Sequence, residues 1–169
     1  EANEVDKQKV NAVRVAAQGK AKRGMKIEPN QWYSLLDQNY NSEIWKNQSD
    51  KCLSCGTCTL VCPTCFCYDV NDEIDLKGET KRVRTWDGCL LRQFTEVAGG
   101  EIFREDIRDR YRHRFFRKGK YLTDRLGFIA CVGCGRCSSQ CVPDIADPVK
   151  VMNLVFDNSE SFVRDENKK

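Results

Sequence analysis

The sequence has little that would place it in a membrane or mark it for export. No apolar run approaches the roughly 18 residues that span a bilayer. The N-terminal residues lack the charged-then-apolar pattern of a secretory signal. The net charge is only +3, which is too small by itself to indicate nucleic acid or a membrane surface as a partner. The chain has 169 residues, of which 31% are charged, so we expect a globular protein that can bury a core without disulfides.

Motifs that hold organic cofactors are missing as well. No Gly-rich nucleotide loop follows a predicted strand, and no CxxCH motif is present to attach haem. There is a single histidine, His113. Outside its cysteines, the chain therefore shows no group of residues that would give it chemistry of its own.

Cysteine, in contrast, is abundant. The chain has 11 cysteines, and six of them lie in CLSCGTCTLVCPTCFC, residues 52–67. An odd number excludes complete disulfide pairing within one chain. Two runs share the spacing C-x2-C-x2-C-x3-C, and their members are the candidate metal ligands: Cys52, Cys55, Cys58 and Cys62 in the first run, and Cys131, Cys134, Cys137 and Cys141 in the second.

This spacing favours iron–sulfur clusters over two alternatives. Structural zinc usually takes paired CxxC motifs or mixed Cys and His ligands, and disulfide frameworks belong to short secreted chains. The repeated run is that of bacterial ferredoxins, in which the fourth cysteine ligates the other cluster. Gly56, Gly133 and Gly135 are expected to take positive φ angles and let the backbone approach the clusters. We therefore expect two 4Fe–4S clusters with crossed ligands, one on Cys52, Cys55, Cys58 and Cys141, the other on Cys131, Cys134, Cys137 and Cys62.

The rest of the chain predicts an α+β fold that is mostly helical. Residues 1–40 are interpreted as an N-terminal arm or linker, residues 41–158 as the two-cluster domain, and residues 159–169 as a polar tail. Because 68 residues separate the two cysteine runs, an insert at 66–125 must fold as its own layer.

Local patterns assign helices and strands within these parts. We expect a helix near Val5 to Ala17, two short helices before the first cysteine run, and a β-hairpin around Lys77-Gly78. Two further helices are predicted in the insert, one capped by Asp87 and one from about Phe103. Asp147-Pro148 opens a last helix.

The order of the motifs resembles a known family. CLSCGTCTLVCPTCFCYDV is followed by RVRTWDGC, AGG, RYRHRF and CVGCGRC, as in the iron–sulfur (beta) subunit of soluble sulfhydrogenases and the similar subunit of anaerobic sulfite reductase. The resemblance covers about residues 40–156 and implies a two-cluster ferredoxin-like domain of the α-helical type. Family members carry a further N-terminal domain, so this chain, which begins at Glu1 rather than Met, is expected to be part of a longer subunit. One departure is Val142, which precedes Pro143 where the family has proline directly after the last ligand.

The resemblance implies a role in electron transfer. In such complexes a flavoprotein subunit exchanges electrons with NAD(P)H or a similar carrier, and the iron–sulfur subunit passes them to or from a catalytic subunit. We thus expect a non-catalytic subunit of an oxidoreductase, with those two subunits as partners and without nucleic acid or a membrane span. Because the expected clusters are oxygen-sensitive and no secretory signal is visible, we expect a cytoplasmic location. The alternative is an iron–sulfur redox-sensing regulator, although no DNA-binding helix pair is visible. The sequence does not identify the terminal acceptor or donor.

Two features are left with several interpretations. Cys65, Cys67 and Cys89 form a third metal site, with His113 as a candidate fourth ligand, or they are buried structural thiols. The segment from Ile102 to Arg125 has nine Lys and Arg against four Asp and Glu. It fits a solvated helix face, a docking surface for a partner subunit or, least well, a nucleic-acid surface. Positive charge close to anionic clusters would also raise their reduction potentials.

Overall fold

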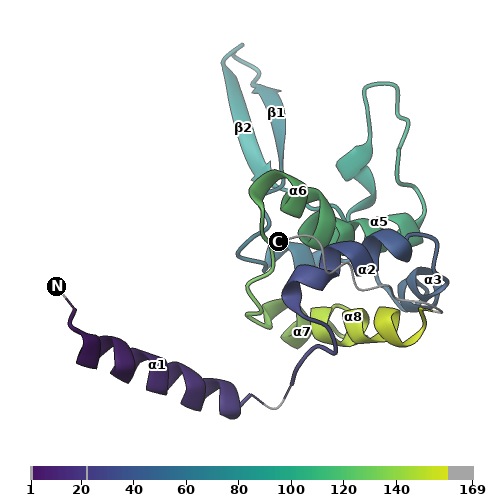
Figure 1. Cartoon of the computed structure of the whole chain (residues 1–169). Coiled ribbons are helices and arrows are strands. Elements are labelled where there is room, and N and C mark those ends of the chain that lie inside the picture. Colours follow the sequence, from purple (N-terminus) through teal and green to yellow (C-terminus); the bar gives the residue numbers. More distant parts are fainter. Residues whose placement is uncertain (1, 22, 160–169) are drawn as a thin grey trace.

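The computed structural model describes residues 2–21 and 23–159, and it has the expected α+β composition. Short helices form the body, and a single two-stranded antiparallel sheet projects from it (Figure 1). None of the helices in the described ranges combines the length and apolar character that a membrane span requires.

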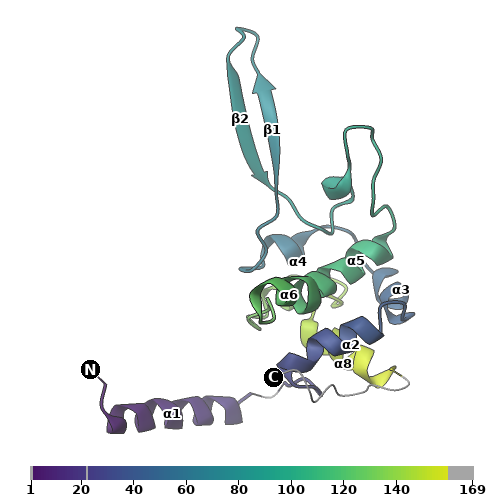
Figure 2. The same cartoon turned by 45° about the horizontal axis from the view of Figure 1, so that its top comes forward.

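The first helix, α1 (Glu4–Gly19), lies apart from the body in both views (Figures 1 and 2). It begins at Asn3, whose side chain accepts a hydrogen bond from the Asp6 N–H at 2.9 Å, while the Asp6 carboxylate accepts one from the Asn3 N–H at 3.2 Å. This reciprocal capping box satisfies two N–H groups that the first turn leaves free. None of the α1 side chains is buried. The helix expected near Val5 to Ala17 is confirmed, and it forms an arm.

The core lies where four helices meet: α2 (Trp32–Gln38), α3 (Ile44–Ser49), α5 (Ile107–Phe116) and α8 (Pro148–Asp157). A 3₁₀ turn, η1 (Pro29–Gln31), leads into α2. Each large apolar side chain contributes about 1.5–3 kcal/mol when fully buried, and the most deeply buried large side chains in this core include Trp32, Leu35, Leu36, Trp45, Tyr111, Phe116 and Met152. Residues 27–36 therefore pack with the body, whereas the sequence pattern grouped them with the arm up to residue 40.

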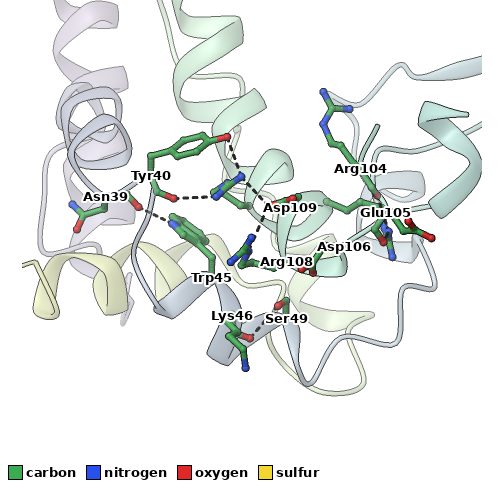
Figure 3. Close-up of polar contacts among 12 residues, drawn as sticks. Asn39, Tyr40, Trp45, Lys46, Ser49, Arg104, Glu105, Asp106, Arg108 and Asp109 are labelled. Carbon is green, nitrogen blue, oxygen red and sulfur yellow. Dashed lines mark hydrogen bonds and ion pairs between the residues drawn. The ribbon is translucent and has the colours of Figure 1, made fainter. Parts of the chain in front are cut away.

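Polar contacts fix α5 against the turn between α2 and α3. The Trp45 indole N–H donates a hydrogen bond to the Asn39 carbonyl oxygen at 2.7 Å (Figure 3). From α5, the Arg112 guanidinium stacks 3.8 Å above the centre of the Tyr40 ring and donates to its hydroxyl at 2.9 Å. These contacts set which face of α5 points into the protein.

The long helical segment of the insert begins at Ile107, four residues later than predicted. Asp106 caps it by accepting a hydrogen bond from the Arg108 N–H at 2.8 Å. After α5 the chain continues through a π-helical turn, η3 (Arg117–Tyr121), and α6 (Leu122–Leu126), which ends at Gly127 with a φ of 76°. A helix was thus correctly predicted here, but it extends further toward the second cysteine run.

The predicted hairpin is confirmed as β1 (Tyr68–Ile74) and β2 (Thr80–Trp86), with Tyr68 opposite Trp86 at its base. It projects away from the body (Figure 2), and nearly all of its residues are exposed. On one face, Arg82 pairs with Asp72 through two hydrogen bonds of 2.7 and 2.8 Å. An isolated two-stranded hairpin has marginal stability in water, so this element depends on such cross-strand pairs.

The prediction of a helix from Asp87 is wrong. Residues 87–99 are irregular apart from one 3₁₀ turn, η2 (Arg92–Thr95). The physical reason is a set of tertiary contacts. The Leu90 side chain is buried, and its carbonyl oxygen accepts hydrogen bonds from Ser54 Oγ at 2.9 Å and Arg110 Nε at 3.1 Å. These contacts fix the segment against the first cysteine loop in an irregular conformation.

The last helix, α8, begins as the sequence indicated. Asp147 accepts a hydrogen bond from the Val149 N–H at 3.0 Å, and Pro148 occupies the first helical position. The Asp147 carboxylate also pairs with Arg23, which ties the segment after α1 to the body. Of the predicted polar tail at 159–169, residues 160–169 lie outside the described part of the chain.

Candidate metal centre

The two cysteine runs fold into loops of the same local shape. In the first loop Ser54 and Gly56 have φ angles of 53° and 70°, and in the second Gly133 and Gly135 have φ angles of 64° and 75°. The left-handed residues thus occupy equivalent positions, directly before and after the second cysteine of each run. Left-handed residues in such loops form concavities of backbone N–H groups that bind anions. The positive φ angles expected at the three loop glycines are confirmed.

Of the four left-handed loop residues, Ser54 is the one with a side chain. A left-handed conformation is less stable by about 1–2 kcal/mol for such a residue. Its hydroxyl group donates to the Leu90 carbonyl oxygen, and it also accepts a hydrogen bond from Arg110 Nη2 at 3.3 Å. The strained position is therefore held by contacts from two other segments of the chain.

Each loop leads into a one-turn helix, α4 (Thr57–Leu60) in the first run and α7 (Arg136–Ser139) in the second. Both helices begin at the left-handed glycine, Gly56 or Gly135. The two helices contact each other. This contact brings together two runs that are far apart in the sequence, and it places the fourth cysteine of each run beside the other loop.

Two cavities result, and each is lined by cysteines from both runs. The first, of about 240 Å³, has mainly apolar walls that include Leu90, Tyr111 and Ile145. The second, of about 430 Å³, has Arg114 and Lys118 in its wall. Both exceed the ~30 Å³ that one water molecule occupies, so they are not ordinary packing voids. The cysteines at the first are Cys52, Cys55, Cys58 and Cys141, and those at the second are Cys131, Cys134, Cys137 and Cys62.

The thiols surround the cavities and do not converge on one point. Among residues 2–21 and 23–159, no three Cys, His, Asp or Glu side chains come close enough together to hold a single metal ion. Four thiols spread around a cavity fit a group of several atoms that is ligated at its corners. The donor set is also right for iron–sulfur clusters, which take four cysteine thiolates. The residues present therefore fit two 4Fe–4S clusters, and the ligand assignment stays a prediction.

Burial and neighbouring thiols make several of these cysteines hard to ionise without a metal. Burial raises the pKa of Cys58 to about 11, and it also raises the pKa of Cys52 and Cys131. Cys62 differs, because hydrogen bonding with Cys65 lowers its pKa, with further contributions from Thr64 and Lys118. A metal cluster must displace the protons from the raised thiols, so cluster binding is coupled to proton release.

The sequence reasoning did not identify three buried cations that face the cysteines. Arg110, Arg114 and Lys118 follow one another at intervals of four along α5 and η3, and their exposed fractions are 5%, 2% and 6%. Residues four apart share one face of a helix. The basic segment, interpreted above as a solvated, docking or nucleic-acid surface, thus turns part of its charge inward. The signal in the sequence was the four-residue spacing of these cations, which matches that of Tyr111 and Phe115.

In two of the three cations, every side-chain nitrogen atom has an oxygen acceptor. Besides its bonds to Leu90 and Ser54, Arg110 donates through Nη1 to the carbonyl oxygens of Arg104 and Glu105. Lys118 Nζ donates to Thr64 Oγ1 at 2.8 Å and contacts the Ala130 carbonyl oxygen at 3.4 Å. Arg110 interacts electrostatically with Cys52, and Lys118 with Cys62 and Cys65.

The remaining cysteines and the histidine do not gather at one place. Cys65 interacts with Cys62, and Cys89 is buried close to Cys67. His113 lines a separate cavity of about 420 Å³, together with Tyr40, Phe103, Arg104, Asp109, Arg112 and Tyr121. The candidate third site is therefore not assembled in the described part of the chain, and His113 does not join the three thiols.

Comparison with known proteins identifies the family. A family model described as a 4Fe–4S dicluster domain matches residues 51–145. The chain belongs to this family. It is also 45% identical over 121 residues to the protein named Sulfhydrogenase 2 subunit beta from Pyrococcus furiosus, a match that covers 72% of this chain and 35% of the relative. The resemblance stated from the motif order is confirmed, and this dicluster chain spans about a third of the length of that relative. No solved structure matches it.

Proposed function

We propose that the chain binds two 4Fe–4S clusters with crossed ligands and transfers electrons through them. The observation that carries the proposal is the division of eight cysteines between two cavities, with three from one run and one from the other in each. Membership of the dicluster family supports the cofactor. The cluster-binding loops and helices would then form a ferredoxin-like domain of the α-helical type, at 41–158, with the insert at 66–125.

The chain's own residues would prepare each site differently. At the first cavity Leu90, Tyr111 and Ile145 exclude water, and at the second the positive charges of Arg114 and Lys118 offset negative charge. Bound clusters supply one-electron transfer, with potentials set by charge, hydrogen bonds to sulfur and solvent exposure. Two such sites in contact through α4 and α7 suit a relay.

We further propose that the relay connects a flavoprotein subunit to a catalytic subunit of a larger oxidoreductase. The support is the similarity to a protein named as a sulfhydrogenase beta subunit. Two-electron hydride donors require an organic cofactor such as a flavin, and the sequence shows no Gly-rich nucleotide loop after a predicted strand that would hold one. Without its partner subunits, such a relay would catalyse none of the reactions of the complete enzyme.

Anaerobic reconstitution of the chain tests the cofactor. We expect about eight irons and eight sulfides per chain, the number held by two 4Fe–4S clusters, and an EPR signal after reduction with dithionite. Near four irons, or zinc in equal amount to protein, would overturn the two-cluster proposal. The purified chain should then show no NAD(P)H oxidation, hydrogen turnover or sulfite reduction. Turnover of any of these without added subunits would overturn the relay.

A further inference from the structure

Arg114 is a buried cation, and the protein uses only part of its hydrogen-bonding capacity. Its side chain is almost completely buried, and Nη2 donates to the Ala146 carbonyl oxygen at 3.0 Å. Nε and Nη1 are inaccessible to water and have no acceptor among the described residues. Buried donors without partners are rare because they lose their hydrogen bonds to water. These two N–H groups therefore indicate an acceptor that the polypeptide does not supply.

The position of Arg114 identifies the acceptor as a group held by the cysteines. Its side chain lines the second cavity beside Cys137, and it interacts most strongly with Cys58, which lines the first. Ala146, whose carbonyl oxygen accepts the hydrogen bond from Arg114 Nη2, also lines the first cavity. Arg114 thus lines the second cavity and is hydrogen-bonded to a residue that lines the first.

The other two buried cations, Arg110 and Lys118, serve as a comparison. Arg110 is engaged by carbonyl oxygens and by Ser54, and of the eight proposed ligands it interacts with Cys52 of the first cavity. Lys118 is engaged by Thr64 and Ala130 and interacts with Cys62 of the second cavity. Of these three cations, only Arg114 combines free N–H donors with proposed ligands from both cavities.

We propose that Arg114 is a shared positioning residue, whose free Nε–H and Nη1–H donate to the cluster–thiolate centres on either side and whose charge raises both reduction potentials. The inference rests on the proposed two-cluster function. The physical reason is that reduction adds one negative charge to a centre, and a fixed buried cation stabilises that charge more strongly than a surface cation screened by water. Hydrogen bonds to the sulfurs act in the same direction. A single cation between the sites would keep the two potentials close together.

The test is an anaerobic redox titration, followed by EPR, of the reconstituted chain and the variant Arg114→Gln. We expect both successive one-electron reductions to become at least tenfold less favourable, which is a shift of about 59 mV to lower potential for each. Arg110→Gln and Lys118→Gln should each shift one of the two reductions more than the other. Arg108→Gln, an exposed arginine on the same helix, is the matched control and should shift neither.

The outcomes separate this inference from the proposed function. If the wild-type chain does not hold about eight irons, the two-cluster function fails. If Arg114→Gln holds the full iron content and both potentials equal those of the wild type, the shared role of Arg114 is overturned while the two-cluster function stands. A shift of only one reduction would likewise overturn the shared role.

A second measurement covers the case in which Arg114→Gln does not retain its clusters. In the double variant Arg23→Lys, Arg110→Gln, with arginine ¹⁵N-labelled in its guanidinium group, Arg114 is the labelled arginine among the residues that line the two cavities. Pulsed EPR of its reduced form should then show coupling of the unpaired electron to ¹⁵N. The absence of that coupling in a chain with full iron content would overturn the inference without any change at Arg114.

Discussion

The hydroxyl group of Tyr111 donates a hydrogen bond to the carbonyl oxygen of Ile145, with 2.6 Å between the two oxygen atoms. Both residues are buried, and both line the first cavity. Tyr111 belongs to α5, and Ile145 lies between the second cysteine run and α8. This single bond therefore connects the helix that carries the buried cations to the segment that positions Cys141.

The first prediction concerns Tyr111→Phe. The substitution keeps the ring but leaves a buried carbonyl oxygen without a donor, which costs about 1–3 kcal/mol. We expect the free energy of unfolding of the reconstituted protein in guanidinium chloride to fall by that amount. Tyr40→Phe is the control, because the Tyr40 hydroxyl is bonded at the surface and its loss should change stability by less than about 0.5 kcal/mol. Equal effects of the two substitutions would contradict the importance of the bond to Ile145.

The second prediction concerns the crossing of ligands. Cys62→Ser should damage the cluster at the second cavity, where Cys62 lies with Cys131, Cys134 and Cys137. The cluster surrounded by the rest of its own run should persist. Iron analysis and EPR of the reduced variant measure this, and we expect loss of signal from one centre.

Cys141→Ser is the reciprocal variant. It should damage the centre at the first cavity, so the two variants should retain different EPR signals. If instead each variant loses the cluster of its own run, the arrangement is not crossed. Cys89→Ser is a useful control, because Cys89 is buried but lines neither of the two cavities.

The third prediction tests the close packing of η3 on α2. A Cβ atom added at Gly119 would lie 2.6 Å from Leu36 Cδ1 and 2.9 Å from Trp32 Cε3. Because both neighbours are buried in the core, Gly119→Ala should cost about 1–3 kcal/mol through overpacking. Thermal and denaturant unfolding measure it. Gly99→Ala meets nothing within 4 Å, so this control should be as stable as the wild type. If Gly119→Ala were as stable as this control, the expected clash would be relieved in the variant.

The fourth prediction concerns pH. Burial and the nearby cations Arg104, Arg117 and Arg112 lower the pKa of His113 to about 4 from its ordinary value of 6.5. Between these two pH values the unfolded chain binds a proton that the folded chain does not. The free energy of unfolding is therefore undiminished above about pH 6.5 and falls as the pH drops toward 4.

His113→Phe should remove this contribution. We expect the free energy of unfolding, measured anaerobically from pH 5 to 8, to depend less steeply on pH in the variant than in the wild type. Asp109 and Tyr121, which line the same cavity, are present in both proteins, so their effects cancel in the comparison. Identical pH profiles of the two proteins would show that His113 binds its proton equally well in the folded and the unfolded state.

Sequence reasoning succeeded where the determining interactions are local. The helix α1, the cap of α8, the hairpin at Lys77-Gly78 and the left-handed glycines of the cysteine loops depend on residues a few positions apart. It failed for residues 87–99, whose apolar spacing suits a helix. There the Leu90 carbonyl oxygen bonds to Ser54 and Arg110, which are 36 and 20 residues away, and nothing in the local pattern reveals those partners.

The sequence by itself determined the metal-binding chemistry of this protein, because thiolates spaced two and three residues apart fit a loop around a cluster whatever surrounds them. Only the tertiary structure decided what faces those loops. The contact between α4 and α7 places the cysteine runs together, and the packing of α5 turns Arg110, Arg114 and Lys118 inward. A row of cations on a helix is compatible with a solvated face or a buried one, and the choice depends on whether negative charge lies opposite. Here the cysteine loops lie opposite, and the thiolates of the proposed clusters would supply that negative charge.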